Sequence, residues 1–403
     1  QLYIEMNRSK RLLTATMAAA FAGIQSFAGN DLTMIVGTYT DQSTSEGMYV
    51  YRFNQDNGKA EAVSCTQSGN PSFLIFNDNA TRVYAVNEYD DERRGASAFS
   101  FDASKGTLSL INNQHCGTSA ASHIKNMPGA APCNIMAYGR HLVTSNYNGG
   151  DISVFPIRED GSIGEESQYL CMFKGNDVDA HIHCCRITPD HRYMIANDLG
   201  NDCIWRFDIN NTDNALPNNT DNALPNNTDN AFLSNAKEIY TAPKGTGPRH
   251  IVFNKKGDVA YLIGELDGSI TVLGYNNGNM RELQRVQASL TKTAGSADIH
   301  ISPDGKFVYA SHRLKDEGVS IHAVDAKTGL LTNVGFQPTA AHPRNFAITP
   351  NGKYLLVACR DSNVIEVFRR DKLTGKLTNT HNDIKLGKPV CIQFANINGG
   401  ASN

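Results

Sequence analysis

The sequence has little net charge, one tryptophan and, beyond residue 24, no apolar run long enough to span a membrane. The formal net charge is −3 over 403 residues, which is too small to indicate nucleic acid or an anionic membrane as a partner. Long amphipathic helical patterns are also missing, whereas glycine (34 residues) and asparagine-rich turns are frequent. These features favour an all-β protein.

The cysteines form no recognisable pattern. There are nine of them, and an odd number without regular spacing argues against a disulfide framework. No C-x-x-C pair is present, so neither a zinc ribbon nor a thioredoxin-type motif is indicated. Most lie in apolar, strand-like runs, such as Cys203 in DCIWRF and Cys359 in LLVACR. We therefore expect buried free thiols.

The N-terminal region has the features of a secretory signal peptide. A basic stretch (Asn7–Arg11) precedes an apolar one (Leu12–Ile24), and Ser26-Phe27-Ala28 supplies small residues at a cleavage site. The apolar run is too short for a transmembrane helix. We predict that residues 1–28 are a signal peptide with Met6 as the start, and that the protein is periplasmic or secreted and free of the membrane. Without that signal it would be cytoplasmic.

Six segments of the chain repeat one pattern. Each has a short apolar strand, a Pro-Asp-Gly or Asn-Gly type of turn, a second strand, a polar loop, a third strand and a fourth. The repeats begin at Asn70, Ala131, His181, Pro248, Ala297 and His342. Four antiparallel strands in roughly 45–50 residues are typical of a β-propeller blade.

The two ends of the chain supply a seventh blade. Met34–Thr40 and Gly47–Phe53 resemble second and third strands, and Lys388–Ala395 resembles a lone first strand. Pairing them closes the ring and removes an exposed edge. The prediction is a single seven-bladed propeller over residues 32–396. The tandem octapeptide NNTDNALP, within residues 210–234, is polar and has no apolar face, so it is interpreted as a flexible surface loop.

Charged and histidine side chains gather at one edge of every repeat. The start of a first strand and the end of a second strand lie at the same rim of the channel, so we expect residues at these positions to converge. Guanidinium groups there suit an anion, and histidine with a carboxylate suits proton transfer. The predicted site residues are Glu88, Asn146, His181, His183, Arg249, His250, Glu265, His300, Arg344 and Asn345.

Other kinds of site find little support. No serine stands in a nucleophile-elbow context, and the helical metal motifs are absent. His181, His183 and His300 could converge on zinc, but His181 and His183 alternate along a strand. We predict neither a metal nor a cofactor. A non-enzymatic propeller that displays a binding face remains an alternative, although such a face favours exposed aromatic residues and Trp205 lies away from the predicted rim.

Several of these stretches resemble the lactonase family of seven-bladed propellers, typified by 6-phosphogluconolactonase. They include GPRHIVFNKKGDVAYLIGEL, ADIHISPDGKFVYASHR and HPRNFAITPNGKYLLVACRDSNVIEVFRRD, and the match runs from about Met34 to Ala395. The chain is also similar to the fungal muconate-lactonizing propellers. The resemblance implies a cofactor-independent hydrolase of a sugar lactone, or a lactone isomerase of the muconate-lactonizing type.

The family's site residues carry over to six positions of this chain: Glu88, His183, Arg249, Glu265, His300 and Arg344. Two departures concern the substrate: Asn134 stands where the family usually has histidine, and Gly264 stands where asparagine usually precedes the glutamate.

The resemblance also suggests roles for these residues. We expect Glu265 or His183 to act as general base on a water, and Arg249 with His300 to stabilise the oxyanion. Arg344 would bind a phosphate or carboxylate, with Glu88, His181, His250, Asn345 and Asn146 as further substrate-binding residues. An exported enzyme would more naturally meet a non-phosphorylated lactone.

Overall fold

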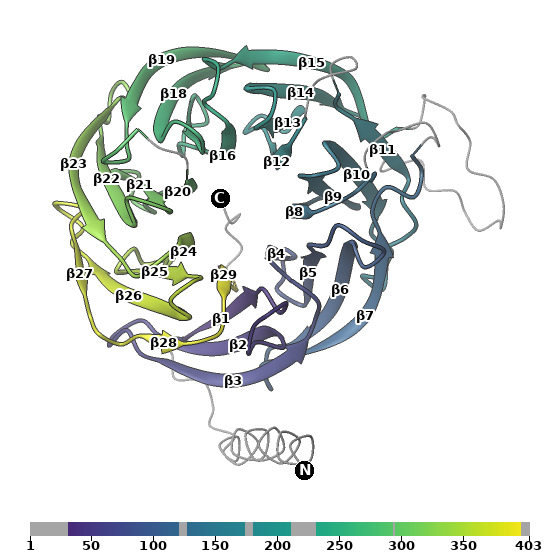
Figure 1. The fold of residues 1–403 in the computed structure, drawn as a ribbon, viewed down its shortest axis with the longest axis horizontal. Helices are drawn as coiled ribbons and strands as arrows, with labels where there is room; N and C mark the ends of the chain where they lie inside the picture. The colour runs from purple at the N-terminus through teal and green to yellow at the C-terminus, as the bar shows by residue number, and fades with distance from the viewer. Residues whose placement is uncertain (1–30, 121–126, 174–179, 211–230, 293–294, 396–403) are drawn as a thin grey trace.

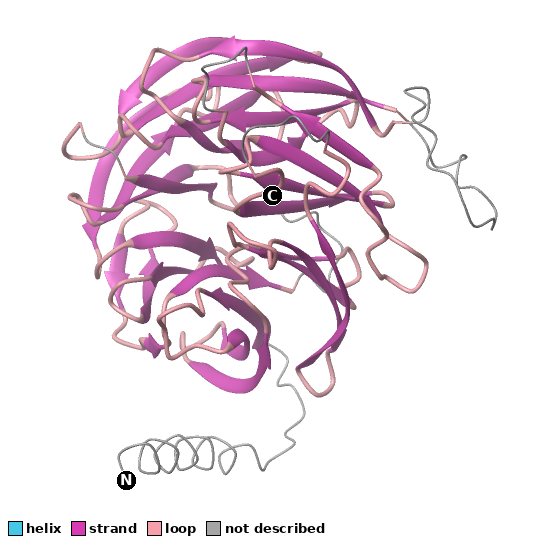
Figure 2. Ribbon diagram, turned by 45° about the vertical axis from the view of Figure 1, so that its right-hand side comes forward, coloured by secondary structure: helices cyan, strands magenta, loops and turns pink. Residues whose placement is uncertain are grey.

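The computed structural model describes residues 31–120, 127–173, 180–210, 231–292 and 295–395. The predicted signal peptide (1–28) and most of the octapeptide loop (210–234) lie outside these residues. The described part consists of strands joined by turns and loops (Figure 2). Within it, no helix has the length and apolar character that crossing a membrane requires.

Seven antiparallel sheets surround a central channel as blades (Figure 1), which confirms the predicted fold. Blade one comprises β4 (Leu74–Phe76), β5 (Arg82–Asn87), β6 (Gly95–Asp102) and β7 (Thr107–His115); blade two, β8 (Pro132–Tyr138), β9 (His141–Asn146), β10 (Asp151–Pro156) and β11 (Gln168–Cys171); blade three, β12 (Ile182–Ile187), β13 (Tyr193–Asp198), β14 (Cys203–Ile209) and β15 (Leu233–Thr241); blade four, β16 (Pro248–Phe253), β17 (Val259–Gly264), β18 (Ser269–Asn276) and β19 (Asn279–Gln287); blade five, β20 (Ser296–Ile301), β21 (Phe307–His312), β22 (Gly318–Val324) and β23 (Leu331–Pro338); blade six, β24 (Pro343–Ile348), β25 (Tyr354–Cys359), β26 (Val364–Arg370), β27 (Leu377–Asn379) and the short β28 (Ile384–Lys385); and blade seven, β29 (Pro389–Phe394), β1 (Asp31–Thr38), β2 (Gly47–Asn54) and β3 (Ala60–Gln67).

Blade seven closes the ring as the sequence predicts. β1 pairs on one side with β2 and on the other with β29, where Met34 lies opposite Phe394 and Val36 opposite Ile392. The N- and C-terminal parts of the propeller thus share one sheet, seen as purple and yellow strands side by side in Figure 1. This pairing leaves no inner edge strand exposed.

The core lies between blades rather than within one. Every residue of β17 and of β25 is buried, because neighbouring blades cover both faces of these strands. The outermost strands, such as β3, alternate between more and less exposed residues and face water. The cysteines follow this division: all nine are free thiols, seven buried and two (Cys65 and Cys171) exposed.

A repeated hydrogen bond ties each of three blades to the next one. A tyrosine on the second strand donates from its hydroxyl to a glycine carbonyl in an outer turn of the following blade. The pairs are Tyr84 with Gly161 (3.1 Å), Tyr261 with Gly329 (2.9 Å) and Tyr309 with Gly375 (2.7 Å). All three glycines have positive φ, so glycine is the residue that these turns favour.

Replacing Tyr261 by phenylalanine is expected to lower the free energy of unfolding by about 1–2 kcal/mol, because the Gly329 carbonyl loses its buried donor. Urea denaturation measures this loss. Tyr138→Phe is the control, since the Tyr138 hydroxyl makes only a marginal, exposed 3.5 Å contact with the His191 carbonyl. Equal stability losses in the two variants would contradict the proposed role of the inter-blade bond.

Candidate functional site

A β-bulge near the start of the first strand shapes the channel mouth in at least five blades. In blade four, Pro248 pairs with Gly264 and Ile251 with Leu262, so β16 holds one residue more than β17 between these pairs. The same shift occurs in β8, β12, β20 and β24. A bulge interrupts the alternation of side chains. Two successive residues, such as Arg249 and His250, therefore line the same cavity.

The residue that follows each second strand faces this mouth from the other side of the hairpin. The seven residues at this position are Tyr39, Glu88, Tyr147, Leu199, Glu265, Arg313 and Arg360. Glu88 and Glu265 belong to the predicted set. Tyr39 was missed because the predicted strand ran to Thr40, whereas β1 ends at Thr38 and leaves Tyr39 as the residue that follows it.

Glu265 is held by two arginines from two blades. Arg249 Nε lies 2.6 Å from Glu265 Oε2, and Arg313 Nη2 lies 3.1 Å from Oε1. Burial alone would raise the pKa of Glu265, but Arg249, Arg313 and Arg344 outweigh it and hold that pKa below its ordinary value. Burial and the neighbouring Arg249 lower the pKa of Arg313 to about 9. The carboxylate of Glu265 is therefore ionised and engaged on both oxygens.

The second carboxylate of the mouth, Glu88, lies beside Arg344. Arg344 Nη2 is 3.7 Å from Glu88 Oε2, and Tyr39 donates to Oε1 at 2.9 Å. The Ser72 hydroxyl also donates to Glu88. Arg344 stacks over the Tyr39 ring with its guanidinium carbon 5.2 Å from the ring centroid. The mouth thus presents three guanidinium groups (Arg249, Arg313, Arg344) and two carboxylates.

Below this cluster lies a cavity with room for about one water molecule. The residues around it come from six blades and include Ser72, Cys133, His183, Arg249, His250, Arg344, Asn345 and Val390. Burial, followed by the charges of Arg249, His250 and Arg344, holds the pKa of His183 well below its usual value. Burial and Arg249 lower the pKa of His250 to about 4. Both imidazoles are neutral at pH 7.

A further carboxylate, Asp298, lies directly behind the cavity. It is buried and accepts hydrogen bonds from the His250 ring (2.8 Å), the His300 ring (3.0 Å) and the Asn345 amide (2.6 Å). His300 also packs edge-on against Phe346, with ring centroids 4.8 Å apart. His300 does not line the cavity, and its hydrogen bond to Asp298 connects it through His250 to Arg249. Its predicted pairing with Arg249 at an oxyanion stays a prediction.

Of the predicted residues, Asn146 and His181 neither line the cavity nor pair with the arginine–carboxylate cluster above it. Asn146 is a correction: it is the last residue of β9, and its amide donates to Asp151 (2.6 Å) and Ser153 (3.0 Å) inside its own blade. The next residue, Tyr147, takes the expected place at the mouth. His181 stacks on Tyr147, with centroids 4.4 Å apart, and is joined to the Tyr147 carbonyl through Nδ1. It lies outside the lining of the cavity.

The three histidines considered as zinc ligands come from two separate blades: His183 lies on β12 and His181 just before it, whereas His300 lies on β20. Across the residues that the structure describes, no three His, Cys, Asp or Glu side chains gather as metal ligands would.

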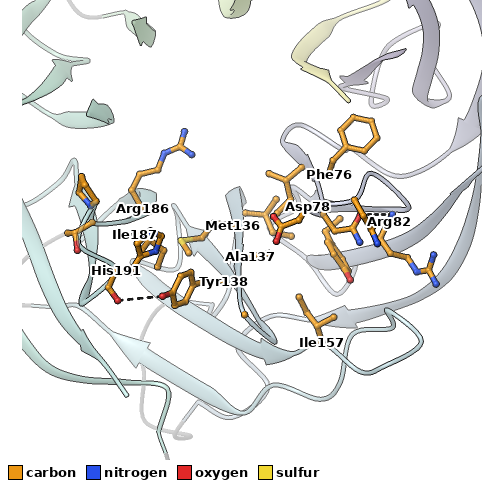
Figure 3. Close-up of a pocket in the computed structure, with 18 of the residues that line it drawn as sticks. Phe76, Asp78, Arg82, Met136, Ala137, Tyr138, Ile157, Arg186, Ile187 and His191 are labelled. Carbon is orange, nitrogen blue, oxygen red and sulfur yellow. Dashed lines mark hydrogen bonds between the residues drawn. The ribbon is translucent and has the colours of Figure 1, made fainter. Parts of the chain in front are cut away.

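A larger cavity lies at the opposite mouth of the channel. Its volume is about 1030 Å³, and its lining includes Met136, Val252 and Phe253 from first strands and Arg186, which projects toward the channel (Figure 3). His191 at its edge is joined to Tyr138. Most of the other charged side chains lie on turns around this rim. The cavity at the mouth that holds Arg249 and Glu265 is far smaller, but there buried arginines, carboxylates and neutral histidines are in contact.

Comparison with known proteins was made on the whole chain. A family model described as "Lactonase, 7-bladed beta-propeller" matches residues 33–394. A 6-phosphogluconolactonase of Formosa agariphila is 38% identical over 372 residues, which is 90% of this chain and 99% of that protein. A candidate 6-phosphogluconolactonase of Bacteroides fragilis, solved as a crystal structure, is 44% identical with a TM-score of 0.81 and covers 92% of this chain and 100% of that one. A periplasmic gluconolactonase of Pseudomonas aeruginosa is 27% identical with a TM-score of 0.78, covering 91% and 99%.

Proposed function

Since the chain belongs to the lactonase family of seven-bladed β-propellers, we propose that it hydrolyses a sugar lactone to the open acid at the mouth that holds Arg249 and Glu265. The chain is a lactonase of the 6-phosphogluconolactonase type. The observation that carries the choice of site is a group of three arginines, two buried (Arg249, Arg313) and one partly exposed (Arg344), held against two carboxylates. This cluster carries one more positive than negative charge. That excess suits an anionic substrate and the negative charge that develops during ester hydrolysis.

The lactone is proposed to lie over the small cavity rather than inside it, because the cavity holds only about one water. The side chains of Glu265, Glu88 and Arg344 remain 21%, 18% and 15% exposed, so a ligand in the mouth can reach them. The cavity beneath would hold the attacking water. This arrangement places water and lactone on either side of the Arg249 guanidinium.

His183 suits the role of general base better than Glu265. Both oxygens of Glu265 are engaged by arginines, so neither is free to take a proton from water. His183 is neutral and lines the cavity. In the proposed reaction the water oxygen bonds to the lactone carbonyl carbon while its proton passes to His183. Arg249 stabilises the oxyanion, the ring C–O bond then breaks, and the proton passes from His183 to the departing ring oxygen.

Arg344 is proposed to recognise the substituent on the sugar ring. It lies beside Glu88 and Tyr39 with its side chain partly exposed, and Tyr39, Glu88 and Glu265 raise its pKa in spite of desolvation, so it is always charged. The Formosa relative is named for a phosphorylated lactone and the Pseudomonas structure for gluconolactone. If the predicted signal peptide directs export, a non-phosphorylated sugar lactone is the substrate we propose.

Arg344→Met separates the two substrates. With 6-phosphogluconolactone, loss of a charged hydrogen bond to phosphate is expected to raise KM by about 10- to 100-fold. With glucono-1,5-lactone, KM is expected to change less than about threefold. Acid release in a pH-stat, corrected for the spontaneous rate, measures both. Equal changes with the two substrates would contradict a role of Arg344 in phosphate recognition.

The same assay tests the proposed function against its alternatives. The wild-type protein should release acid from at least one of the two lactones well above the blank. Conversion of a muconate to a lactone without acid release would instead indicate the isomerase. No turnover, together with saturable binding of a sugar or peptide at this mouth, would indicate a non-enzymatic binding module.

A further inference from the structure

Asp298 is the most heavily hydrogen-bonded side chain around the cavity. It stands on β20 at the same repeat position that His250 occupies on β16 and Asn345 on β24. Oδ1 accepts from His250 Nδ1 (2.8 Å) and from the backbone amide of Ile299 (3.0 Å). Oδ2 accepts from His300 Nε2 (3.0 Å), Asn345 Nδ2 (2.6 Å) and the backbone amide of Phe346 (3.3 Å). The carboxylate is almost completely buried and ties blade five to blades four and six.

The partners of His250 fix which of its nitrogens carries the proton. Nδ1 faces the Asp298 carboxylate, which accepts hydrogen bonds, so Nδ1 must be the donor. Nε2 lies 3.4 Å from Arg249 Nη1, and a guanidinium can only donate, so Nε2 must be the acceptor. A neutral imidazole satisfies both contacts with one proton, and the lowered pKa of His250 agrees with that neutral form.

The orientation of Arg249 depends on this histidine. Its Nε is bound by Glu265 at 2.6 Å, and its Nη1 donates to the Ala297 carbonyl and to His250 Nε2. Nη2 has no hydrogen-bond partner among the described residues. Three anchors thus hold the guanidinium at Nε and Nη1 and leave Nη2 available at the cavity that Arg249 lines.

We propose that Asp298 is a positioning residue of the lactonase site, which acts through His250 to hold Arg249 with its Nη2 directed at the lactone carbonyl. This inference rests on the proposed function. Asp298 itself does not line the cavity, so it contacts neither water nor substrate. Asp298 sets the orientation of the His250 ring and places its proton on Nδ1. His250 Nε2 is then free to accept a hydrogen bond from Arg249 Nη1.

Asp298→Asn is the informative substitution because it keeps the shape and exchanges one acceptor for a donor. If the new amide nitrogen took the place of Oδ2, it would meet three donors, from His300, Asn345 and Phe346. In the place of Oδ1 it meets the His250 ring and one backbone amide. We expect the second arrangement, in which His250 must accept at Nδ1 and carry its proton on Nε2. The proton on His250 Nε2 then faces the N–H groups of Arg249, so two donors meet and no hydrogen bond forms. We expect the guanidinium to rotate away from His250.

A double-mutant cycle tests the relay with Asp298→Asn, His250→Asn and the double variant, all in the full-length protein. Each single change is expected to lower kcat about 10- to 100-fold with KM changed much less, and the double variant should be no slower than the slower single one. Losses that multiply in the double variant would show that Asp298 acts by another path, such as His300. Activity that is unchanged in Asp298→Asn would also overturn the inference.

A second measurement does not depend on turnover. Two-bond ¹H–¹⁵N correlation spectra of histidine-labelled protein distinguish the two neutral forms of a histidine ring. His250, assigned by its absence in His250→Asn, should carry its proton on Nδ1 in the wild type and on Nε2 in Asp298→Asn. A wild-type His250 protonated on Nε2 would refute the relay. Failure of the wild type to hydrolyse any lactone, with the expected tautomers present, would refute the proposed function and leave the Asp298–His250–Arg249 chain standing as structure.

Discussion

Replacing Arg249 by methionine is expected to lower kcat for lactone hydrolysis about 10²–10³-fold, the loss that follows removal of one oxyanion donor. Methionine retains much of the buried volume but supplies no N–H to the carbonyl oxygen. It also removes the partner of Glu265 Oε2, so that the carboxylate keeps only the ion pair of its Oε1 with Arg313. KM should change much less than kcat, because the lost interaction strengthens only as negative charge develops. Initial rates in a pH-stat over a range of lactone concentrations measure both constants.

Arg370→Met is the matched control for this variant. Arg370 is as deeply buried as Arg249 and is paired with Asp304 at 2.9 Å, but it lies on β26 among the outer turns, bound to Tyr309 and Gly352. Its removal should destabilise the fold and leave kcat of the remaining folded protein near the wild-type value. Thermal denaturation followed by circular dichroism shows how much of each variant is folded. Arg249→Met with wild-type kcat would place the chemistry elsewhere.

The free energy of unfolding is expected to fall steeply between pH 6.5 and pH 4. Burial lowers the pKa of His250 and His322 to about 4, and that of His312 and His342 to about 3. In the unfolded chain a histidine takes up its proton near pH 6.5. Below that pH the unfolded state binds more protons, so stability is complete above pH 6.5 and is lost as the pH falls toward the folded pKa values. Each such histidine contributes up to about 1.4 kcal/mol per pH unit in this range.

Urea denaturation at intervals from pH 4.5 to pH 7.5 measures this dependence. His322→Leu should lower the slope of stability against pH by up to about 1.4 kcal/mol per pH unit, because one buried histidine no longer titrates. The substitution leaves no hydroxyl unpaired, since Ser320, the hydrogen-bond partner of His322, is also bound to His312. His381→Asn, at an exposed turn, should leave the slope unchanged. A wild-type stability that is flat down to pH 4.5 would show that these histidines are protonated in the folded protein.

The repeat made the fold predictable and made part of the site predictable. Hairpin turn residues at regular spacing specify four-stranded blades, and the pairing of the chain ends follows from their missing strands. Arg249, Arg344, Glu88 and Glu265 were found because a position in one blade reaches the same rim as that position in the next. The functional roles of these residues remain predictions, whereas their meeting at one mouth is a property of the structure.

The placement predicted from the sequence differs from the structure where a shift of one residue along a strand turns the side chain to the other face. Asn146 ends β9 and points into its blade, while Tyr147 after it faces the mouth. His300 was chosen on β20, although the bulge makes Asp298 the counterpart of His250. The sequence pattern does not show where a bulge inserts its extra residue. One signal was available in the sequence: His250, Asp298 and Asn345 each precede the turn of their blade by the same number of residues. This alignment would have identified Asp298 as the counterpart of the other two.

The sharing of one sheet by β29 and β1 also bears on how the protein is made. β1 is among the first strands to be synthesised, yet its inner partner comes only with Pro389–Phe394. Before β29 has been synthesised, blade seven consists of β1, β2 and β3 alone, so the ring cannot close even if the other six blades have already folded. Closure of the propeller is therefore expected to follow the synthesis of Pro389–Phe394.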